Sequence, residues 1–388
     1  MKNVDAAKEK FGKLIFSELE RIEDIKEQQE FIDFKKLDRI IIGIAPGDGI
    51  GPIIIKQARR VLNLLLKDAI RSGKVELREI EGLTIENRSA KMQSVPDDVL
   101  AEIKKCHVIL KGPSTTPRAT DPWPNLRSAN ATLRKELDLF ANVRPVCIPE
   151  KGIDWTFYRE NIEGAYIWGN KGIHVNDDLD IDFVVETSFG SERIARAAFE
   201  FAKNNGKTNV TVVTKANIVK LTDGNFISAC KKVSKDYPGI TLEERFVDAT
   251  AAKLADPEFN QGLQVFVLPN LYGDIITDIA AELQGGLGTA GSANIGTRYA
   301  VFEAIHGSAP FLMSHNRGEY ADPSSILRAT AMLLSYIGYK KQSEKLTKAL
   351  NICGIEERKI VITSLRKDAS TEEYGDYVIE TIEKLGDI

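Results

Sequence analysis

A continuous apolar run near the start of the chain constrains the fold more than any other feature. Residues 40–45 read Ile-Ile-Ile-Gly-Ile-Ala, which is typical of a strand buried on both faces of a parallel sheet. A glycine-rich turn follows, and a helical pattern then covers Ile53–Leu66. Similar units recur, with expected strands at Val108–Lys111, Val210–Thr214 and Val265–Leu268 and expected helices at Glu192–Asn204 and Asp223–Lys235. This alternation predicts an α/β protein with a mostly parallel sheet covered by helices.

The first 38 residues precede this pattern and differ from it. Between residues 4 and 34, apolar side chains recur every three to four positions, at Phe11, Leu14, Ile15, Leu19, Ile22 and Ile25. That spacing places them on one face of a helix. We therefore expect an N-terminal helical extension over residues 1–38 that packs on the protein or on a partner subunit. A regulatory role is the less favoured alternative, and we assign the extension no chemistry.

Composition excludes several classes of function. The 388 residues carry 52 basic and 56 acidic side chains, a net charge of −4, so we expect no broad basic surface for nucleic acid. The longest apolar runs, such as Ile40–Pro46, are far shorter than the roughly 20 residues of a membrane helix. The four cysteines form no C-x-x-C pair, which argues against disulfides or structural zinc. These features, with no secretory or transit signal at the N-terminus, favour a cytoplasmic location without membrane attachment.

The glycine-rich turn at Gly47–Pro52 lies between an expected strand and an expected helix. Its glycines would let the backbone approach a ligand closely. However, the spacing differs from the dinucleotide motif G-x-G-x-x-G, and no acidic residue marks a ribose site about 20 residues later. The sequence leaves open whether this is a ligand loop or only a tight turn.

A second motif combines hydroxyl, amide and guanidinium groups. The segment Ser128–Arg134 includes Asn130, and it is followed by Arg144 and Arg159. Because guanidinium groups bind carboxylates in two-point fashion, several converging arginines indicate a substrate with more than one acidic group. Any one of these arginines alone is better explained as a solvated surface residue.

Acidic residues supply the complementary chemistry. Asp274 and Asp278 lie four residues apart and share one face if the segment is helical. Together with a distant third carboxylate such as Asp248, they could bind Mg²⁺ or Mn²⁺, which prefer oxygen ligands. A helix N-cap is the alternative reading of Asp274.

Two further segments suggest a nucleotide and a subunit contact. The glycine-rich run 285–288, the segment Asn294–Gly296 and the segment Glu303–Pro310 are typical of loops shaped around a nucleotide, where His306 could stack or hydrogen-bond. The four histidines lack metal-ligand spacing, so zinc is disfavoured. The acidic, alternating segment Lys171–Glu186 predicts a protruding hairpin or arm suited to a dimer contact.

Taken in order, these motifs resemble the isocitrate and isopropylmalate dehydrogenase family of β-decarboxylating dehydrogenases over nearly all of residues 39 to 345. The matching stretches are Gly47–Pro52, Lys111–Pro117, Ser128–Arg134, Asp138–Val146, Tyr158–Tyr166, Lys215–Gly224, Asn270–Asp278, Gly285–Gly296 and Glu303–Pro310. The resemblance implies a two-domain fold that is not a true Rossmann fold. A large, cofactor-side domain would comprise residues 39–139 and 285–388, and a small domain with a dimer arm residues 140–284.

The resemblance also implies roles for individual residues. The substrate carboxylates would be bound by Ser128, Asn130, Arg134, Arg144 and Arg159, and the metal by Asp274, Asp278 and the partner subunit's Asp248. Lys215 would deprotonate the substrate hydroxyl, and Tyr166 would protonate the enolate after CO₂ departs. The nicotinamide cofactor would lie near Lys111, Thr115, Thr116, Asn294, His306 and Gly307. Because sites in this family are completed by a neighbouring subunit, a homodimer or higher homo-oligomer is expected.

Substrate and cofactor preference depend on two short segments. Ser128 and Asn130 favour the γ-carboxylate of isocitrate over an isopropyl group, because apolar residues would be expected around the latter. Homoisocitrate and 3-isopropylmalate remain alternatives, since the neighbours of Ser128 are not diagnostic and the insertion Arg118–Asn125 is unusual. After Pro310, Phe311 and Leu312 cannot pair with a 2′-phosphate, so we predict NAD. His315 and Arg317 leave NADP open.

A different class of function is a regulatory subunit of the same family that binds ligands without turnover. Such subunits usually lack catalytic residues. Here Tyr166, Lys215, Asp248, Asp274 and Asp278 are all present, so we predict an active metal-dependent enzyme that oxidises and decarboxylates a hydroxy-polycarboxylate.

Overall fold

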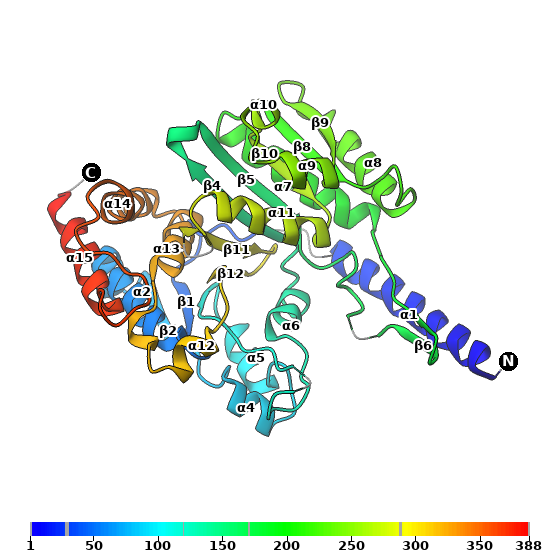
Figure 1. Cartoon of the computed structure of the whole chain (residues 1–388), viewed down its shortest axis with the longest axis horizontal. Helices are drawn as coiled ribbons and strands as arrows, with labels where there is room; N and C mark the ends of the chain where they lie inside the picture. Colours follow the sequence, from blue (N-terminus) through cyan, green and yellow to red (C-terminus); the bar gives the residue numbers. More distant parts are fainter. Residues whose placement is uncertain (1, 28–30, 119, 170, 287–288, 387–388) are drawn as a thin grey trace. The chain divides into compact units, whose positions relative to one another are not determined.

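The computed structural model describes every residue except 1, 28–30, 119, 170, 287–288 and 387–388. The chain divides into two compact units (Figure 1). Unit 1 comprises Met1–Phe31 and Phe140–Leu283, and unit 2 comprises Ile32–Leu139 and Gln284–Ile388. Both units combine a β-sheet with helices, so the predicted α/β class with an N-terminal helix is confirmed.

Unit 2 is built on five strands in the order β2-β1-β3-β12-β11. The strands are β1 (Ile40–Ala45), β2 (Val75–Glu79), β3 (Val108–Lys111), β11 (Gly291–Ile295) and β12 (Ala300–Ala304). β1 pairs in parallel with β2 and β3, β3 pairs in parallel with β12, and β12 is antiparallel to β11. All four residues of β3 are buried, as its apolar sequence predicts.

The helices of unit 2 flank these strands. They are α2 (Gly51–Leu65), α3 (Lys67–Arg71), α4 (Ile85–Ala90), α5 (Asp97–Ile103), α6 (Ala129–Glu136), α12 (Pro310–Ser314), α13 (Ser324–Tyr336), α14 (Lys340–Asn351) and α15 (Thr371–Lys384), with short turns η3 (Gly318–Tyr320) and η4 (Ile352–Glu356). α13 packs on β11 and β12, and α2 packs against both α13 and α15.

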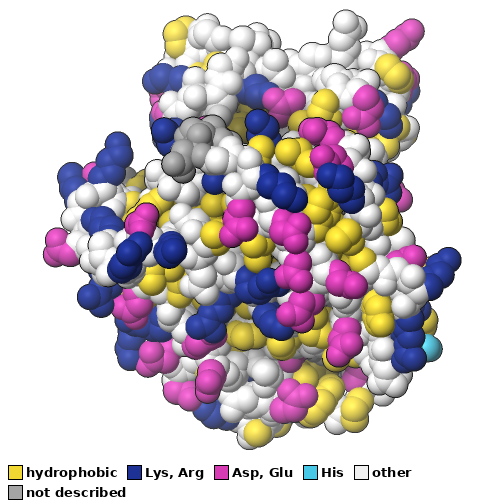
Figure 2. Space-filling model, turned by 90° about the vertical axis from the view of Figure 1, so that its left-hand side faces the viewer, with side chains coloured by type: hydrophobic (Ala, Val, Ile, Leu, Met, Phe, Trp, Pro, Cys, Tyr) yellow, Lys and Arg dark blue, Asp and Glu magenta, His cyan; other side chains and the backbone are white. Residues whose placement is uncertain are grey.

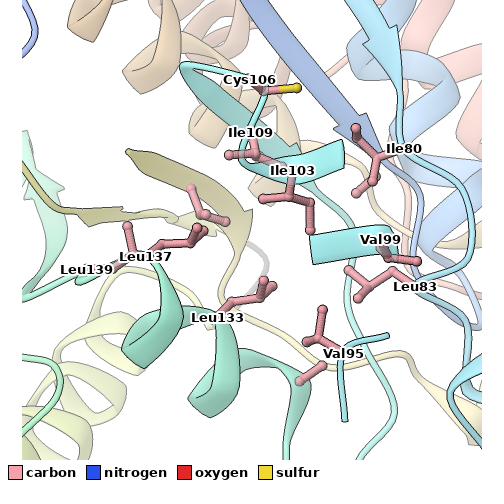
Figure 3. Close-up of a cluster of buried hydrophobic side chains, with 13 residues drawn as sticks. Ile80, Leu83, Val95, Val99, Ile103, Cys106, Ile109, Leu133, Leu137 and Leu139 are labelled. Atoms are coloured by element: carbon pink, nitrogen blue, oxygen red, sulfur yellow. The ribbon is translucent and has the colours of Figure 1, made fainter. Parts of the chain in front are cut away.

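An apolar cluster in unit 2 holds α6, the helix that carries Asn130 and Arg134. Figure 3 shows Leu133 of α6 and Leu137, which directly follows the helix, in one cluster with side chains from α5 and β3, including Ile103 and Ile109. Each of these four side chains is at most 3% exposed. The apolar face of α6 is therefore fixed by the core, and its polar residues lie on the remaining faces.

Unit 1 is built on five strands in the order β4-β5-β10-β8-β9. They are β4 (Ala141–Ile148), β5 (Ile153–Glu160), β8 (Asn209–Thr214), β9 (Thr241–Phe246) and β10 (Val265–Leu268). β4 and β5 are antiparallel, and the other neighbouring pairs are parallel. The helices are α7 (Ser188–Asn204), α8 (Thr222–Ser234), α9 (Val247–Lys253), α10 (Pro257–Asn260) and α11 (Asn270–Leu283), and the turn η1 is Pro149–Lys151.

Aromatic packing holds α11 against this sheet. The rings of Phe157 and Phe266 stack with centroids 4.4 Å apart, and Trp155 meets the ring of Phe266 edge-on. Ile276 and Ala280 of α11 belong to the same buried cluster. The apolar face of α11 is thereby fixed on β5, which determines where its acidic residues lie.

The N-terminal helix α1 (Lys2–Glu27) belongs to unit 1 and packs along a two-stranded hairpin. The hairpin joins β6 (Ile173–Asn176) and β7 (Leu179–Ile181) and confirms the hairpin predicted between residues 171 and 186. Phe11 stacks on Phe183 with ring centroids 5.0 Å apart. The helix is described from Lys2 to Glu27, and residues 31–34, which the predicted helix included, are not helical.

On the face shown in Figure 2, basic and acidic side chains are interspersed. No helix in the described part of the chain is long and apolar enough to cross a membrane.

The apolar cluster beneath α6 gives a stability prediction. Leu133→Ala removes a side chain that is 3% exposed, so we expect a loss of about 2–5 kcal/mol in the free energy of unfolding, measured with urea. Lys348→Ala, at an exposed position of α14, serves as the control and should change stability by less than about 0.5 kcal/mol. Equal effects of the two substitutions would contradict the packing described for α6.

Candidate active site

In unit 1, residues predicted for substrate, metal and acid–base chemistry lie together around α11. We call Arg144, Arg159, Tyr166, Asp274 and Asp278 the acid–arginine cluster. They come from β4, β5, the segment after β5, and α11. The structure therefore brings together side chains from three separate segments of the sequence.

α11 supplies the two carboxylates of the cluster. The helix begins at Asn270, so Asp274 lies in its second turn and is not the N-cap. Asp278 follows one turn later, and the side chains of Asp274 and Asp278 are 36% and 58% exposed. The expectation that they share one helix face is confirmed.

Arg159 is the buried centre of the cluster, with a side chain that is 1% exposed. Its Nε and Nη2 donate to Asn270 Oδ1 at 3.1 and 2.7 Å, and Nε also donates to the Asn270 carbonyl at 2.9 Å. Nη1 donates to Asp274 Oδ1 at 2.6 Å. Because a Cβ at Gly273 would lie 2.4 Å from Arg159 Cγ, only glycine leaves room for this side chain. The guanidinium is thus fixed at the start of α11.

Arg144 lies on the same face of the β4–β5 pair as Arg159. The antiparallel register pairs Arg144 with Phe157 and Asn142 with Arg159, and residues two apart on a strand share a face. Arg144 Nη1 donates to Thr277 Oγ1 at 2.7 Å and to Asp278 Oδ1 at 3.0 Å. Each aspartate of α11 therefore has an arginine partner.

Tyr166 completes the cluster from the segment after β5. Its hydroxyl donates to Asp274 Oδ2 at 2.7 Å, and the Arg159 guanidinium carbon lies 5.5 Å from its ring centroid. Gly164 turns the chain ahead of it, with a φ of 73° that favours glycine. A phenol that is 37% exposed and hydrogen-bonded to a carboxylate is placed where it can exchange a proton with a ligand.

Lys215 and Asp248 form a separate ion pair in unit 1. Lys215 Nζ lies 2.7 Å from Asp248 Oδ1, and this hydrogen bond holds the pKa of Asp248 below its usual value. The backbone N–H of Lys215 donates to Asp223 Oδ2 at 2.7 Å, and burial raises the pKa of Asp223. Within the described residues, no three His, Cys, Asp or Glu side chains are arranged as a metal site.

In unit 2, the predicted substrate residues begin α6. Ser128 is the N-cap, and its Oγ accepts the Ala131 N–H at 3.4 Å. Asn130 Oδ1 is buried and has no hydrogen-bond partner among the described residues. A buried amide oxygen without a partner is unfavourable and indicates a position where a ligand or water would bind. Arg134 lies in the last turn of α6, and its positive charge acts with that of Lys111 to lower the pKa of the Glu303 carboxylate.

Two predicted cofactor residues, Lys111 and Asn294, share a buried carboxylate. Lys111 Nζ lies 2.9 Å from Glu303 Oε2 and donates to the Gly112 carbonyl at 2.8 Å, and Asn294 Nδ2 donates to Glu303 Oε1 at 2.8 Å. Burial opposes ionisation of Glu303, but Lys111 and Arg134 nevertheless hold its pKa below the usual value. These contacts show that both residues support the sheet, whatever else they bind.

The glycine-rich turn is packed against the protein's own backbone. A Cβ at Gly47 would lie 2.2 Å from the Pro113 carbonyl oxygen, and one at Gly49 would lie 2.1 Å from that of Ser308. Between them, the Asp48 carboxylate accepts the N–H groups of Ile85 and Thr115, each at 2.7 Å. The geometry is that of a tight turn, and a ligand-binding role for this loop stays a prediction. Asp48 was not singled out in the sequence, because an aspartate in a glycine turn is unremarkable locally.

The remaining cofactor candidates lie on loops of unit 2. Thr115 Oγ1 lies 3.0 Å from Ser308 Oγ, and Thr116 is exposed. His306 Nδ1 lies 3.1 Å from the Gly307 carbonyl oxygen, and its buried Nε2 has no hydrogen-bond partner among the residues described. In the glycine-rich run, Leu287 and Gly288 lie outside the described residues.

The segment after Pro310, which was expected to determine cofactor preference, is tied to the loop before α15. Arg317 Nε donates to the Ser364 carbonyl at 2.7 Å. The ring of His315 lies 4.2 Å from that of Phe311. Arg366, which the sequence reasoning missed, donates to the carbonyls of His315 and Asn316 at 3.3 and 3.2 Å. Arg317 therefore already has an intramolecular partner.

Residues 41–378 match the family model described as isocitrate/isopropylmalate dehydrogenase. The chain belongs to this family of oxidoreductases, whose members act on small hydroxy acids, and the resemblance drawn from the sequence is confirmed.

Named relatives differ in substrate and cofactor. The chain is 36% identical over 352 residues to the isocitrate/homoisocitrate dehydrogenase of Thermus thermophilus, covering 89% of this chain and 99% of that protein. It is 36% identical to the NADP isocitrate dehydrogenase of Rickettsia bellii, covering 89% of this chain and 70% of that protein. The crystal structure of isocitrate dehydrogenase from Methylococcus capsulatus is similar, with a TM-score of 0.76 and 33% identity, covering 88% of this chain and 99% of that one.

The buried carboxylate of Glu303 gives a second stability prediction. Lys111→Met leaves this group without its ammonium partner, so we expect a loss of about 3–5 kcal/mol in the free energy of unfolding. The double variant Lys111→Met/Glu303→Gln removes both charges and should recover much of that loss. Urea unfolding of both variants tests the interaction, and a double variant no more stable than Lys111→Met would show that lost packing, not the charge, dominates.

Proposed function

We propose that this protein catalyses the oxidative decarboxylation of isocitrate to 2-oxoglutarate and CO₂, with NAD⁺ as electron acceptor and Mg²⁺ or Mn²⁺ as cofactor. The observation that carries the proposal is the acid–arginine cluster, in which two arginines and a tyrosine converge on the two carboxylates of α11. Arginine side chains bind the carboxylates of a polycarboxylate substrate, and aspartate oxygens are preferred ligands of hard cations such as Mg²⁺. Family membership supports a small hydroxy acid as substrate.

The chemistry of Asp274 and Asp278 fits a divalent cation. Both side chains are partly exposed, and both supply carboxylate oxygens from adjacent turns of one helix. The partner subunit's Asp248 is the proposed third ligand. A cation held there would supply Lewis acidity toward the substrate's hydroxyl and carboxylate oxygens.

The protein's own groups would bind the acid and move protons. Arg134, Arg144 and Arg159 are proposed to bind substrate carboxylates with Ser128 and Asn130. Lys215 would accept the proton of the substrate hydroxyl, and a bound nicotinamide would supply the acceptor for the hydride from C2. When the C–C bond breaks, CO₂ leaves and the electron pair forms an enolate, to which Tyr166 would deliver a proton at carbon.

Preference for isocitrate is proposed from Ser128 and Asn130. The buried Asn130 amide has an unpartnered oxygen among the described residues, and a turn of the amide would present an N–H donor to a carboxylate. An apolar substituent would leave that amide unsatisfied. Homoisocitrate is the second candidate, because it differs by one methylene and because the Thermus thermophilus relative carries both names.

Preference for NAD⁺ is proposed from the segment after Pro310. Phe311 offers an apolar side chain there, 61% exposed, and Arg317 is hydrogen-bonded to the Ser364 carbonyl. A 2′-phosphate would need a cation free to bind it. NADP⁺ is the alternative, favoured by His315 and Arg366 nearby and by the cofactor named for the Rickettsia bellii relative. We propose that the nicotinamide is bound near Lys111, Thr115, Thr116, Asn294, His306 and Gly307.

We also propose a homodimer or higher homo-oligomer in the cytoplasm, with Lys215 and Asp248 serving a neighbouring subunit's site. Exposed apolar side chains lie close in sequence to Lys215 and Asp248. Ile218 and Leu221 are 68% and 87% exposed, and Phe246 is 46% exposed. Such residues are commonly covered at subunit contacts.

The central test is reduction of the nicotinamide followed at 340 nm with isocitrate, homoisocitrate or 3-isopropylmalate, each with NAD⁺ and NADP⁺ and with Mg²⁺ or Mn²⁺. We expect turnover with isocitrate and NAD⁺. Turnover of only another acid would refute the reading of Ser128 and Asn130, and a higher kcat/KM with NADP⁺ would refute the cofactor assignment. Absence of turnover in every combination would favour a non-catalytic subunit.

The metal assignment is tested by Asp274→Asn. The amide keeps the shape but loses the charge that a cation needs, so we expect metal-dependent kcat to fall by about a hundredfold or more. Glu282→Gln, at an exposed position of the same helix, is the control and should retain activity. Near-normal turnover by Asp274→Asn would eliminate Asp274 as a metal ligand.

A further inference from the structure

The carboxylate of Glu163 joins the N-terminal helix to the main part of unit 1. Its side chain is fully buried, and Oε1 lies 2.6 Å from Nη2 of Arg21 on α1, a side chain that is only 12% exposed. The Thr187 N–H donates to Oε2 at 2.8 Å, and the Thr187 hydroxyl donates to Oε1 at 2.7 Å. One carboxylate is therefore bound by α1 and by the residue that caps α7.

The start of α7 is shaped to receive this carboxylate. Thr187 is the N-cap, and its hydroxyl accepts the Gly190 N–H at 2.9 Å. A Cβ at Gly190 would lie 2.6 Å from the carboxyl carbon and both oxygens of Glu163. Negative charge at a helix N-terminus is favoured by the helix dipole. Glycine at this position thus lets the charge approach the helix closely.

Glu163 lies in a group of buried acids, among which Glu160 is also influenced by the positive charge of Arg193. Burial and the neighbouring Glu163 raise the pKa of Glu160 to about 8, and burial raises the pKa of Glu186 as well. The two carboxylate oxygens of Glu186 have no hydrogen-bond partner within the described part of the chain. Arg21 brings a guanidinium from outside this segment into direct contact with Glu163, where removing it would leave a buried charge poorly compensated.

The same segment leads directly to the acid–arginine cluster. The Glu163 carbonyl accepts the Asn270 Nδ2 hydrogen bond at 3.1 Å. Asn270 Oδ1 in turn receives two hydrogen bonds from Arg159. Arg159 and Tyr166, three residues after Glu163, both donate to Asp274. Contiguous hydrogen bonds therefore connect Arg21 with the groups proposed to bind the substrate and to deliver a proton.

This connection originates outside the family's shared region. The match to the family model begins at residue 41, whereas α1 ends at Glu27. We propose that Arg21 is a positioning residue for the reaction, because it holds Glu163 and, through Asn270, sets Arg159 and the Tyr166 segment. The proposal rests on the proposed function and assigns the N-terminal extension a part in the active site.

Kinetics of Arg21→Gln test the proposal. If the loss of the Arg21 charge misplaces Arg159, binding of the acid should weaken more than binding of the dinucleotide. We expect KM for the acid to rise about tenfold or more, with KM for the dinucleotide within about twofold. Arg21→Lys should restore part of the loss. The matched control is Lys13→Gln on the exposed face of α1, which loses only a pair with Glu9 and should behave as wild type.

A double-mutant cycle with Glu163 separates a positioning role of Arg21 from a general loss of folding. Glu163→Gln removes the charge that Arg21 compensates, so adding Arg21→Gln to it should have little further effect on KM. Additive effects in this double-mutant cycle, or equal proportional losses in every kinetic constant, would overturn the proposal.

Hydrogen exchange gives a readout that does not depend on turnover. In Arg21→Gln, backbone amides of residues 160–166 and 270–274 should exchange faster than in Lys13→Gln. Faster exchange confined to α1 would overturn the positioning role. If the wild-type protein turns over none of the acids, the proposed function fails, while the exchange comparison still decides whether Arg21 holds this segment.

Discussion

The buried guanidinium of Arg159 is the group on which the acid–arginine cluster depends. A cation that is 1% exposed is tolerated only when its donors are paired. Asn270 binds two of its nitrogens and Asp274 a third. Because Asn270 begins α11 and Asp274 lies one turn later, the pairing fixes the helix relative to β5. Tyr166 and Arg144 then contact carboxylates whose positions are already set.

Unit 2 uses buried carboxylates in a similar way. Asp48 accepts backbone N–H groups from two segments that are distant in sequence, and Glu303 joins side chains from β3 and β11. Asp48 thereby fixes the path of its loop, and Glu303 links neighbouring strands of the sheet. Some acidic residues of this protein thus organise the backbone, whereas Asp274 and Asp278 remain partly exposed.

Much of the fold could be predicted because it depends on local patterns. The apolar runs that identify β1, β3 and β10 begin and end where the structure places them, and the four-residue spacing of Asp274 and Asp278 is sufficient to put them on one helix face. The partners of these residues could not be predicted. Arg21 and Glu163 are 142 residues apart, and Asn270 and Arg159 are 111 apart. The chain has 52 basic residues, and nothing local distinguishes Arg21 from the others. The residue types themselves indicated a polycarboxylate and a divalent cation, whereas the full set of residue roles came from the family resemblance and remains a proposal.

The two helix glycines that admit charged side chains limit how this protein can be engineered. Gly190 and Gly273 lie in the first turns of α7 and α11, where alanine would raise helix propensity by about 1 kcal/mol. A stabilisation strategy that replaces helical glycines would select both positions. Yet the space a methyl group would occupy is filled by Glu163 at one site and Arg159 at the other. The added methyl groups would displace the two buried side chains around which unit 1 is organised, so sequence-based thermostabilisation should leave these positions unchanged.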